Sequence, residues 1–262
     1  LVMPCLAIGI WSKFIPIFMV PWFALWWWQD VDRNNWYKQV GGIFAGLSLG
    51  AVVTYVAWLP YWTGWGVFKS LIIQSKWAVI SYFAIIYYSL KPIFSWFLNE
   101  NAHWYLTRFV HVILLTAAVY LFWPYIKKVI NLIFKKEKWQ DVDYIIAIFV
   151  SMFIYLFIWQ KSFWPWYGAW LIPLGIILSL RLEDSYIRKI TIWLSLSPLT
   201  FYAVWIINWM VFKMDGGSQL WFYYYFVLTV SAYPLYLLCQ WRRSDYLLDD
   251  QNAVSYEAGI KK

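Results

Sequence analysis

Charged residues are scarce in this chain of 262 residues, since Asp, Glu, Lys and Arg make up only 13% of it. That is about half the share found in a typical soluble domain. Hydrophobic residues account for 63% and aromatic residues for 24%. Apolar stretches near or above the ~20 residues that cross a bilayer recur along the chain. The composition excludes a soluble globular domain and predicts an all-α, polytopic transmembrane helical bundle.

Cysteine and histidine are also rare, with two residues of each. Cys5 and Cys239 fall on opposite membrane faces in the topology predicted below, which argues against a disulfide between them. Residues so few and so far apart cannot form a zinc-binding set. The chain also lacks a Gly-rich phosphate loop, a G-x-S-x-G turn and any heptad or solenoid repeat. No basic run is laid out for nucleic acid, so its net charge of +8 indicates topology and lipid contact.

The apolar stretches predict about seven membrane crossings in one bundle over residues 1–241, followed by a cytoplasmic tail over 242–262. The crossings cover residues 3–28, 41–60, 105–126, 144–160, 164–181, 190–212 and 220–241. The dense basic cluster from Lys127 to Lys138 should be cytoplasmic, as should Arg242 and Arg243. The amino end then lies outside, and no basic region or Met precedes the first apolar run. We therefore expect a fragment that lacks helices upstream.

Residues 61–104 leave two topologies open, because Ala78–Trp96 is apolar enough to be a span. If this segment does not cross, the loop with Arg33 and Lys38 lies inside, together with the dense basic cluster and the basic tail. If it does cross, that loop is placed outside. We favour the first topology, in which 61–104 is an extracytoplasmic loop and Phe68–Phe97 forms one or two amphipathic helices in the interface.

In this topology the outer side is net basic. Only two carboxylates, Glu100 and Asp215, lie there. The basic residues of this side are Lys69, Lys76, Lys91, Arg108, Lys161 and Lys213. Such an excess suits the phosphate of a lipid carrier, although attraction to anionic headgroups would also explain it. Asp215 lies in an Asp-Gly-Gly turn, so Glu100 is the only outer carboxylate placed to act as a general base.

Arg108 and His111 stand three residues apart on one helix, just after His103 and Trp104. Arginine can hold a phosphate with two N–H groups, and histidine can donate a hydrogen bond or transfer a proton. This cluster is the best phosphate candidate in the sequence. For His111, a packing role in an apolar helix is the alternative.

Aromatic residues concentrate in the stretch Lys161–Leu174, which begins a helix with Trp164, Pro165, Trp166 and Tyr167. Their rings are suited to stacking on a sugar or on a prenyl chain, whereas a belt at the membrane interface is the alternative. Lys13 lies near mid-depth of the first predicted span. A lysine at that depth faces a cavity or snorkels to the surface.

Three stretches, in order WSKFIPIFMVPWFAL, LPYWTGWGVFKSLI and WPWYGAWLIPL, resemble membrane glycosyltransferases of the GT-C fold that use polyprenyl-phosphate sugars. The chain is more similar to bacterial mannosyltransferase-like proteins than to oligosaccharyltransferases. The resemblance covers most of residues 1–180. In such families the catalytic acidic residue lies in the first outer loop, and nothing here matches it, which fits a chain lacking its amino-terminal catalytic part.

The resemblance implies a cavity open to the outside, lined by Lys13, Trp164, Trp166 and Tyr167. Lys69, Lys76, Arg108 and Lys161 would be available to the donor phosphate. The reaction would pass mannose or another hexose to a hydroxyl of a glycan or lipid acceptor, at the outer face of a bacterial inner membrane. No soluble cofactor is implied, and a divalent cation is left open. The alternatives are a transporter or flippase of lipid-linked sugars, a glycan ligase or polymerase, and a structural subunit.

Overall fold

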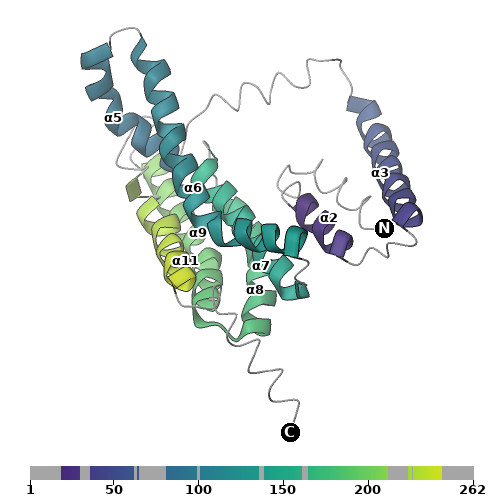
Figure 1. Ribbon diagram of the computed structural model, residues 1–262. Coiled ribbons are helices and arrows are strands. Elements are labelled where there is room, and N and C mark those ends of the chain that lie inside the picture. Colours follow the sequence, from purple (N-terminus) through teal and green to yellow (C-terminus); the bar gives the residue numbers. More distant parts are fainter. Residues whose placement is uncertain are drawn as a thin grey trace. The chain divides into compact units, whose positions relative to one another are not determined.

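The computed structural model of the chain is almost entirely helical in the residues that it describes, with no strand among them (Figure 1). The described residues are 19–29, 36–61, 64, 81–98, 101–135, 139–160, 165–211, 224–225 and 227–243. The chain divides into two compact units. The first comprises Leu1–Trp77 and Ile130–Met152, and the second comprises Ala78–Val129 and Phe153–Lys262. The predicted all-α class is therefore confirmed.

The longer elements are α-helices, interrupted by short 3-10 and π-helical segments. They run in the order α2 (Val20–Gln29), α3 (Trp36–Trp58), η2 (Leu59–Tyr61), α5 (Tyr82–Leu98), α6 (Ala102–Lys135), α7 (Asp141–Phe153), η5 (Ile154–Trp159), η6 (Pro165–Trp170), α8 (Leu171–Leu182), α9 (Ser185–Val211), η7 (Val227–Ala232) and α11 (Tyr233–Arg243). The segments η2 and η6 are 3-10 helices, whereas η5 and η7 are π-helices.

Four helices within the described residues are long and apolar enough to cross a membrane. They are Trp36–Val56, Ala102–Asn131, Asp141–Trp159 and Ser185–Ile207, and a shorter apolar helix covers Tyr167–Leu182. These segments overlap five of the predicted crossings, so the membrane class is confirmed. The total of seven and the side of each terminus stay predictions. The predicted crossings at 3–28 and 220–241 lie partly outside the described residues.

In the first unit, the side chain of Gln29 joins α2 to the residues that begin α7. Its Nε2 donates to the carbonyl of Trp139 at 2.8 Å, and its Oε1 accepts from the N–H of Trp139 at 2.7 Å. The Tyr144 hydroxyl donates to the same Oε1 at 2.9 Å. Further along α2, Trp22 Nε1 donates to Ser151 Oγ at 2.9 Å. Polar groups that burial would leave unsatisfied are thus paired across the two helices.

In the second unit, α8 and α9 form a tight helical hairpin. A Cβ added to Gly175 would lie 2.2 Å from Thr191 Oγ1, so only glycine permits this approach. Glu183 turns the chain with φ 52, in the left-handed region. The buried Asp184 then begins α9, because its Oδ1 accepts backbone N–H groups two and three residues further on, at 2.7 and 2.9 Å.

The helix α5 lies beside the first part of α6, in the same unit (Figure 1). Its amino-terminal half is packed, with Phe83, Ala84, Ile85 and Tyr87 buried, whereas the residues around Pro92 and beyond are largely exposed. Part of the predicted interfacial region is therefore a helix. Whether it lies in the interface stays a prediction, and residues 65–80 lie outside the described part.

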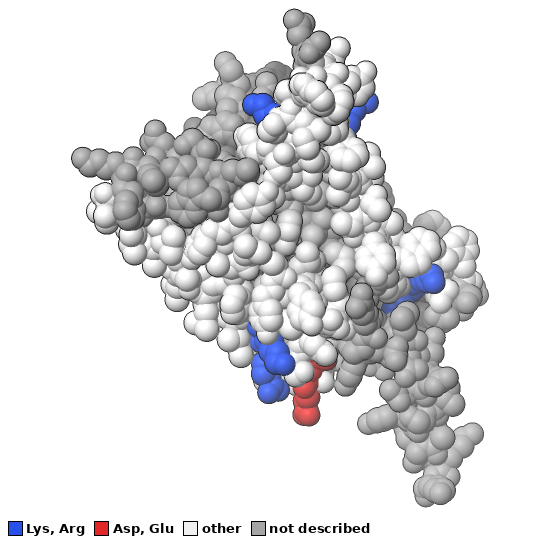
Figure 2. Space-filling view, turned by 90° about the vertical axis from the view of Figure 1, so that its left-hand side faces the viewer, with Lys and Arg blue, Asp and Glu red and all other residues white. Residues whose placement is uncertain are grey.

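Charge is sparse on the face shown in Figure 2. Lys and Arg side chains gather there in a few small groups, separated by a broad surface of uncharged residues. On α6, Arg108 and Lys127 bracket a segment without any Asp, Glu, Lys or Arg. At about 1.5 Å per residue this segment measures about 28 Å, close to the hydrocarbon thickness of ~30 Å. The two cations are thus spaced as the ends of a membrane-crossing segment.

Candidate functional site

The structure describes three of the predicted site side chains: Arg108, His111 and Tyr167. The other predicted site residues Lys13, Lys69, Lys76, Glu100, Lys161 and Trp164 lie outside the described residues, and so does the side chain of Trp166. Arg108 and His111 share one face of α6, as expected from their spacing. Tyr167 is half-buried in η6, near enough to Tyr155 of η5 for the two phenols to interact electrostatically.

Arg108 is an exposed cation held against an aromatic ring. Its guanidinium carbon lies 3.8 Å from the centroid of the Trp104 ring, one helical turn earlier on α6. A guanidinium stacked in this way keeps the N–H groups along its edge available to an anion. Across the part of the chain that the structure describes, no carboxylate is paired with Arg108. The arrangement is suited to holding a phosphate.

His111 is fixed by its own helix and by two aromatic rings. Its Nδ1 lies 2.6 Å from the carbonyl oxygen of Thr107. Because a carbonyl can only accept, Nδ1 carries the proton, and Nε2 of the neutral ring is left as an acceptor. The rings of Phe83 and Trp159 lie 5.0 and 5.9 Å from the imidazole centroid. His111 therefore belongs to α6 but is oriented by α5 and η5 as well.

In His103 the two ring nitrogens have the opposite roles to those in His111. Its Nδ1 is hydrogen-bonded to the hydroxyl of Tyr87, a buried residue of α5. Burial raises the pKa of the Tyr87 phenol, and the neighbouring Tyr88 adds to the effect. The phenol is protonated at neutral pH. Because an imidazole nitrogen is a better acceptor than a phenol oxygen, we assign the hydroxyl as the donor to Nδ1 and Nε2 of His103 as the N–H side of the ring. One end of α6 thus carries an imidazole donor at His103 and an imidazole acceptor at His111.

The π-helical segment η5 ends beside His111, at Trp159. Its residues Ile154 and Leu156 to Ile158 are buried, but Trp159 is 41% exposed. The next residue, Gln160, closes the segment through an N–H bond to the Tyr155 carbonyl at 2.9 Å. Its side-chain Oε1 is buried and has no hydrogen-bond partner. Short π-helical segments are frequent at functional sites, and a buried acceptor without a donor requires an explanation.

The sequence named Arg108 and His111 as candidates but not the residues that other elements bring to His111. Phe83 and Tyr87 come from α5, and Trp159 and Gln160 come from η5. The sequence signal that could have pointed to Trp159 and Gln160 is their position at the end of the predicted span 144–160. No family model, curated protein or solved structure matches the chain. The described residues contain four helices long and apolar enough to cross a membrane, and α6 carries a basic and aromatic candidate site.

Proposed function

We propose that the protein is a membrane glycosyltransferase of the GT-C type. It would transfer a hexose from a polyprenyl-phosphate donor to an acceptor hydroxyl at the extracytoplasmic face. The observation that carries the proposal is the exposed guanidinium of Arg108, stacked on Trp104 at 3.8 Å. The resemblance in the sequence supplies the reaction, and this cation supplies a place for the donor phosphate.

The depth of Arg108 suits a lipid-linked phosphate. It lies within the candidate span Ala102–Asn131, at the start of its uncharged segment. A phosphate carried by a prenyl chain sits at the headgroup level, while the chain extends into the hydrocarbon. Exposed apolar side chains of α6, among them Phe109, Val112 and Leu115, continue from Arg108 into that segment. They offer a surface to the lipid part of the donor.

In such a reaction the acceptor oxygen bonds to the anomeric carbon of the sugar, and the carbon–oxygen bond to the phosphate breaks. The proton of the acceptor hydroxyl would pass to a carboxylate base, for which Glu100 is the candidate in the sequence. The bonding electrons leave with the phosphate, whose negative charge increases. A cation placed beforehand stabilises that charge in the transition state more than in the ground state. Arg108 would have this role, and His103 Nε2–H is a further donor on the same stretch of α6.

The proposal is tested by binding, with the chain in nanodiscs of neutral phosphatidylcholine. We expect labelled undecaprenyl phosphate to bind more tightly than undecaprenol. Arg108→Gln should weaken the binding of undecaprenyl phosphate by roughly 10- to 100-fold, the range expected for the loss of a charge-assisted hydrogen bond. Arg188→Gln is the matched control, because Arg188 is also exposed on a candidate span but lies on the predicted cytoplasmic side.

Two outcomes would refute the proposal. One is equal binding of undecaprenyl phosphate and undecaprenol. The other is an equal loss of phosphate affinity in Arg108→Gln and Arg188→Gln. Competition with phosphatidylglycerol vesicles separates a carrier site from a general headgroup site. A carrier site keeps its preference for undecaprenyl phosphate when anionic lipid is in excess, whereas a headgroup site does not.

A further inference from the structure

We propose that His111, Trp159 and Gln160 form the subsite for the sugar of the donor, next to Arg108. This inference rests on the proposed function and adds the ligand group that each residue would recognise. Nε2 of His111 accepts a hydrogen bond from a sugar hydroxyl, the Trp159 ring lies against the sugar, and Oε1 of Gln160 accepts from a second hydroxyl.

The first step of the argument is the state of His111. Its Nδ1–H is committed to the Thr107 carbonyl at 2.6 Å. The ring packs between Phe83 at 5.0 Å and Trp159 at 5.9 Å, so its orientation is set by three elements. His111 is only partly buried, so a ligand can reach an acceptor that is already oriented before binding. Hexoses carry several hydroxyl donors, whereas a prenyl chain carries none.

The second step is the ring of Trp159. The residues before it in η5 are buried, yet Trp159 itself is 41% exposed and lies against His111. An indole offers a flat apolar face together with one N–H donor. The C–H faces of a hexose match that surface. A ring beside an imidazole acceptor is therefore suited to one face and one edge of a sugar.

The third step is the buried Oε1 of Gln160, which follows Trp159 directly in the chain. It has no hydrogen-bond partner. The Gln160 backbone is bonded through its N–H to the Tyr155 carbonyl at 2.9 Å, which fixes where the side chain leaves the chain after Trp159. A missing donor of this kind is expected where a ligand or an ordered water completes the site. A sugar hydroxyl would satisfy it.

The fourth step is the distance to Arg108. Residues three apart on a helix have Cβ atoms about 5–6 Å from each other. In a polyprenyl-phosphate sugar the phosphate is bonded to the anomeric oxygen, so sugar and phosphate are immediate neighbours. Arg108 and His111 have the spacing that one such headgroup requires.

One experiment tests the acceptor without any ligand. The chain contains only two histidines, so ¹⁵N-histidine labelling in nanodiscs gives two sets of ring signals, assigned with His103→Gln. We expect His111 to be protonated at Nδ1 and His103 at Nε2. A His111 ring protonated at Nε2 would remove the acceptor and overturn the inference.

A second experiment compares undecaprenyl phosphate with undecaprenyl-phosphomannose and undecaprenyl-phosphoglucose. His111→Phe keeps a ring but removes both nitrogens. It should weaken the binding of whichever sugar ligand binds more tightly about tenfold, and the binding of the bare phosphate less than about twofold. His111→Gln should recover part of the loss, because its amide oxygen can reach the position of Nε2. Trp159→Leu should behave like His111→Phe, with Trp123→Leu as the matched control at 46% exposure.

The outcomes separate the two proposals. Suppose that Arg108→Gln weakens the binding of all three ligands. If His111→Phe and Trp159→Leu then weaken the binding of the bare phosphate as much as that of the sugar ligands, the sugar subsite is wrong and the phosphate site stands. If no ligand binds in an Arg108-dependent way, the proposed function fails, and the subsite that rests on it fails too. The tautomer of His111 would still be known from the labelling.

Discussion

Gly175 of α8 and Thr191 of α9 pack so closely that a Cβ on the glycine would lie 2.2 Å from the threonine Oγ1. The hydroxyl itself is bonded within α9, because it donates to the Ile187 carbonyl at 2.8 Å. The threonine cannot swing aside without losing that bond. Small residues that let two helices approach in this way are typical of membrane helix interfaces.

Gly175→Ala should therefore separate α8 from α9 and lower the free energy of unfolding by about 1–3 kcal/mol. The matched control is Gly42→Ala on α3, where an added Cβ would meet nothing within 4 Å. Unfolding by SDS added to detergent micelles measures the free energy of unfolding of both variants. Combining Gly175→Ala with Thr191→Ala should recover part of the loss. Equal stability of the two single variants would contradict the tight crossing.

The Asp184 carboxylate should contribute to the stability of α9 as its N-cap. Asp184→Ala removes the acceptor of two backbone N–H groups and should cost about 1 kcal/mol, whereas Asp184→Asn keeps an acceptor and should cost much less. The same SDS unfolding measures both variants. An equal loss of stability in Asp184→Asn and Asp184→Ala would show that the charge of Asp184, rather than its hydrogen bonds, stabilises α9.

Gln29 should hold α2 in place in the first unit. Gln29→Ala removes three hydrogen bonds to Trp139 and Tyr144 and leaves their buried groups unsatisfied. At about 1 kcal/mol for each bond, we expect α2 to open locally, with faster hydrogen exchange of its amides. Gln140→Ala, at an exposed neighbouring position, is the control. Unchanged exchange in α2 would mean that Trp22 and Trp26 hold it without Gln29.

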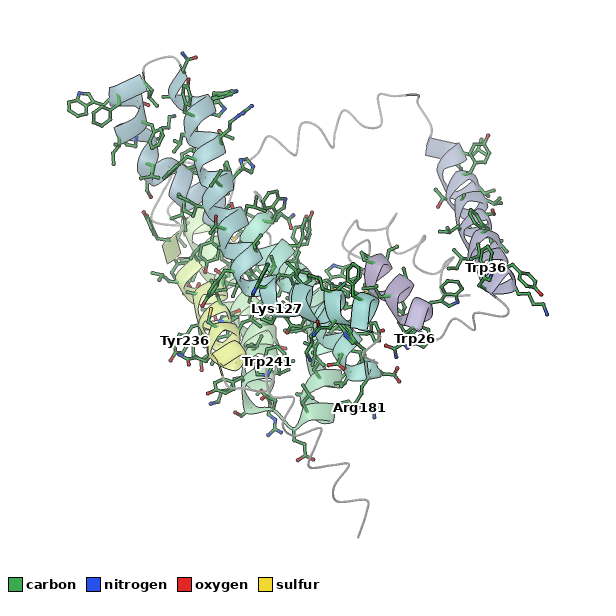
Figure 3. All side chains as sticks on the ribbon, in the orientation of Figure 1. Trp26, Trp36, Lys127, Arg181, Tyr236 and Trp241 are labelled. Atoms are coloured by element: carbon green, nitrogen blue, oxygen red, sulfur yellow. The ribbon has the colours of Figure 1, made fainter. Side chains whose placement is uncertain are left out.

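Arg108 and Lys127 should lie at opposite faces of the membrane. Figure 3 labels Lys127 on α6, and its ammonium lies 5.8 Å from the centroid of the Trp123 ring. In a background without Cys5 and Cys239, cysteine at 108 should react with an impermeant maleimide from one side only, and cysteine at 127 from the other. Cysteine at Leu115 should stay unlabelled. Labelling of 108 and 127 from the same side would refute α6 as a span.

The Tyr87 phenol should make the chain less stable at high pH. Its pKa is raised by burial, so as pH rises past the ordinary value of about 10 the unfolded chain loses this proton before the folded chain does. Folded stability contributed by the protonated phenol is complete below that pH and falls above it. Tyr87→Phe should flatten the part of the stability curve above about pH 10. A curve of unchanged slope would contradict the shift.

The sequence predicted the class well but the site only in part. Apolar runs reveal membrane helices because a bilayer requires a minimum length of uncharged side chains, and five of the predicted crossings overlap apolar helices. Arg108 and His111 could be named as candidates for a similar reason, since helical spacing places residues three apart on one face. Phe83, Trp159 and Gln160 were not, because no periodicity within α6 indicates which rings approach it from α5 and η5.

Composition and hydropathy by themselves determined that this chain is helical, belongs in a membrane and carries a cation beside a histidine near the end of one span. These properties depend on each segment's own side chains and on the bilayer. Only the tertiary structure decided that Nδ1 of His111 is bonded to the Thr107 carbonyl and that Nδ1 of His103 is bonded to the Tyr87 hydroxyl. Which nitrogen carries the proton depends on the group it faces, and packing brings that group into place.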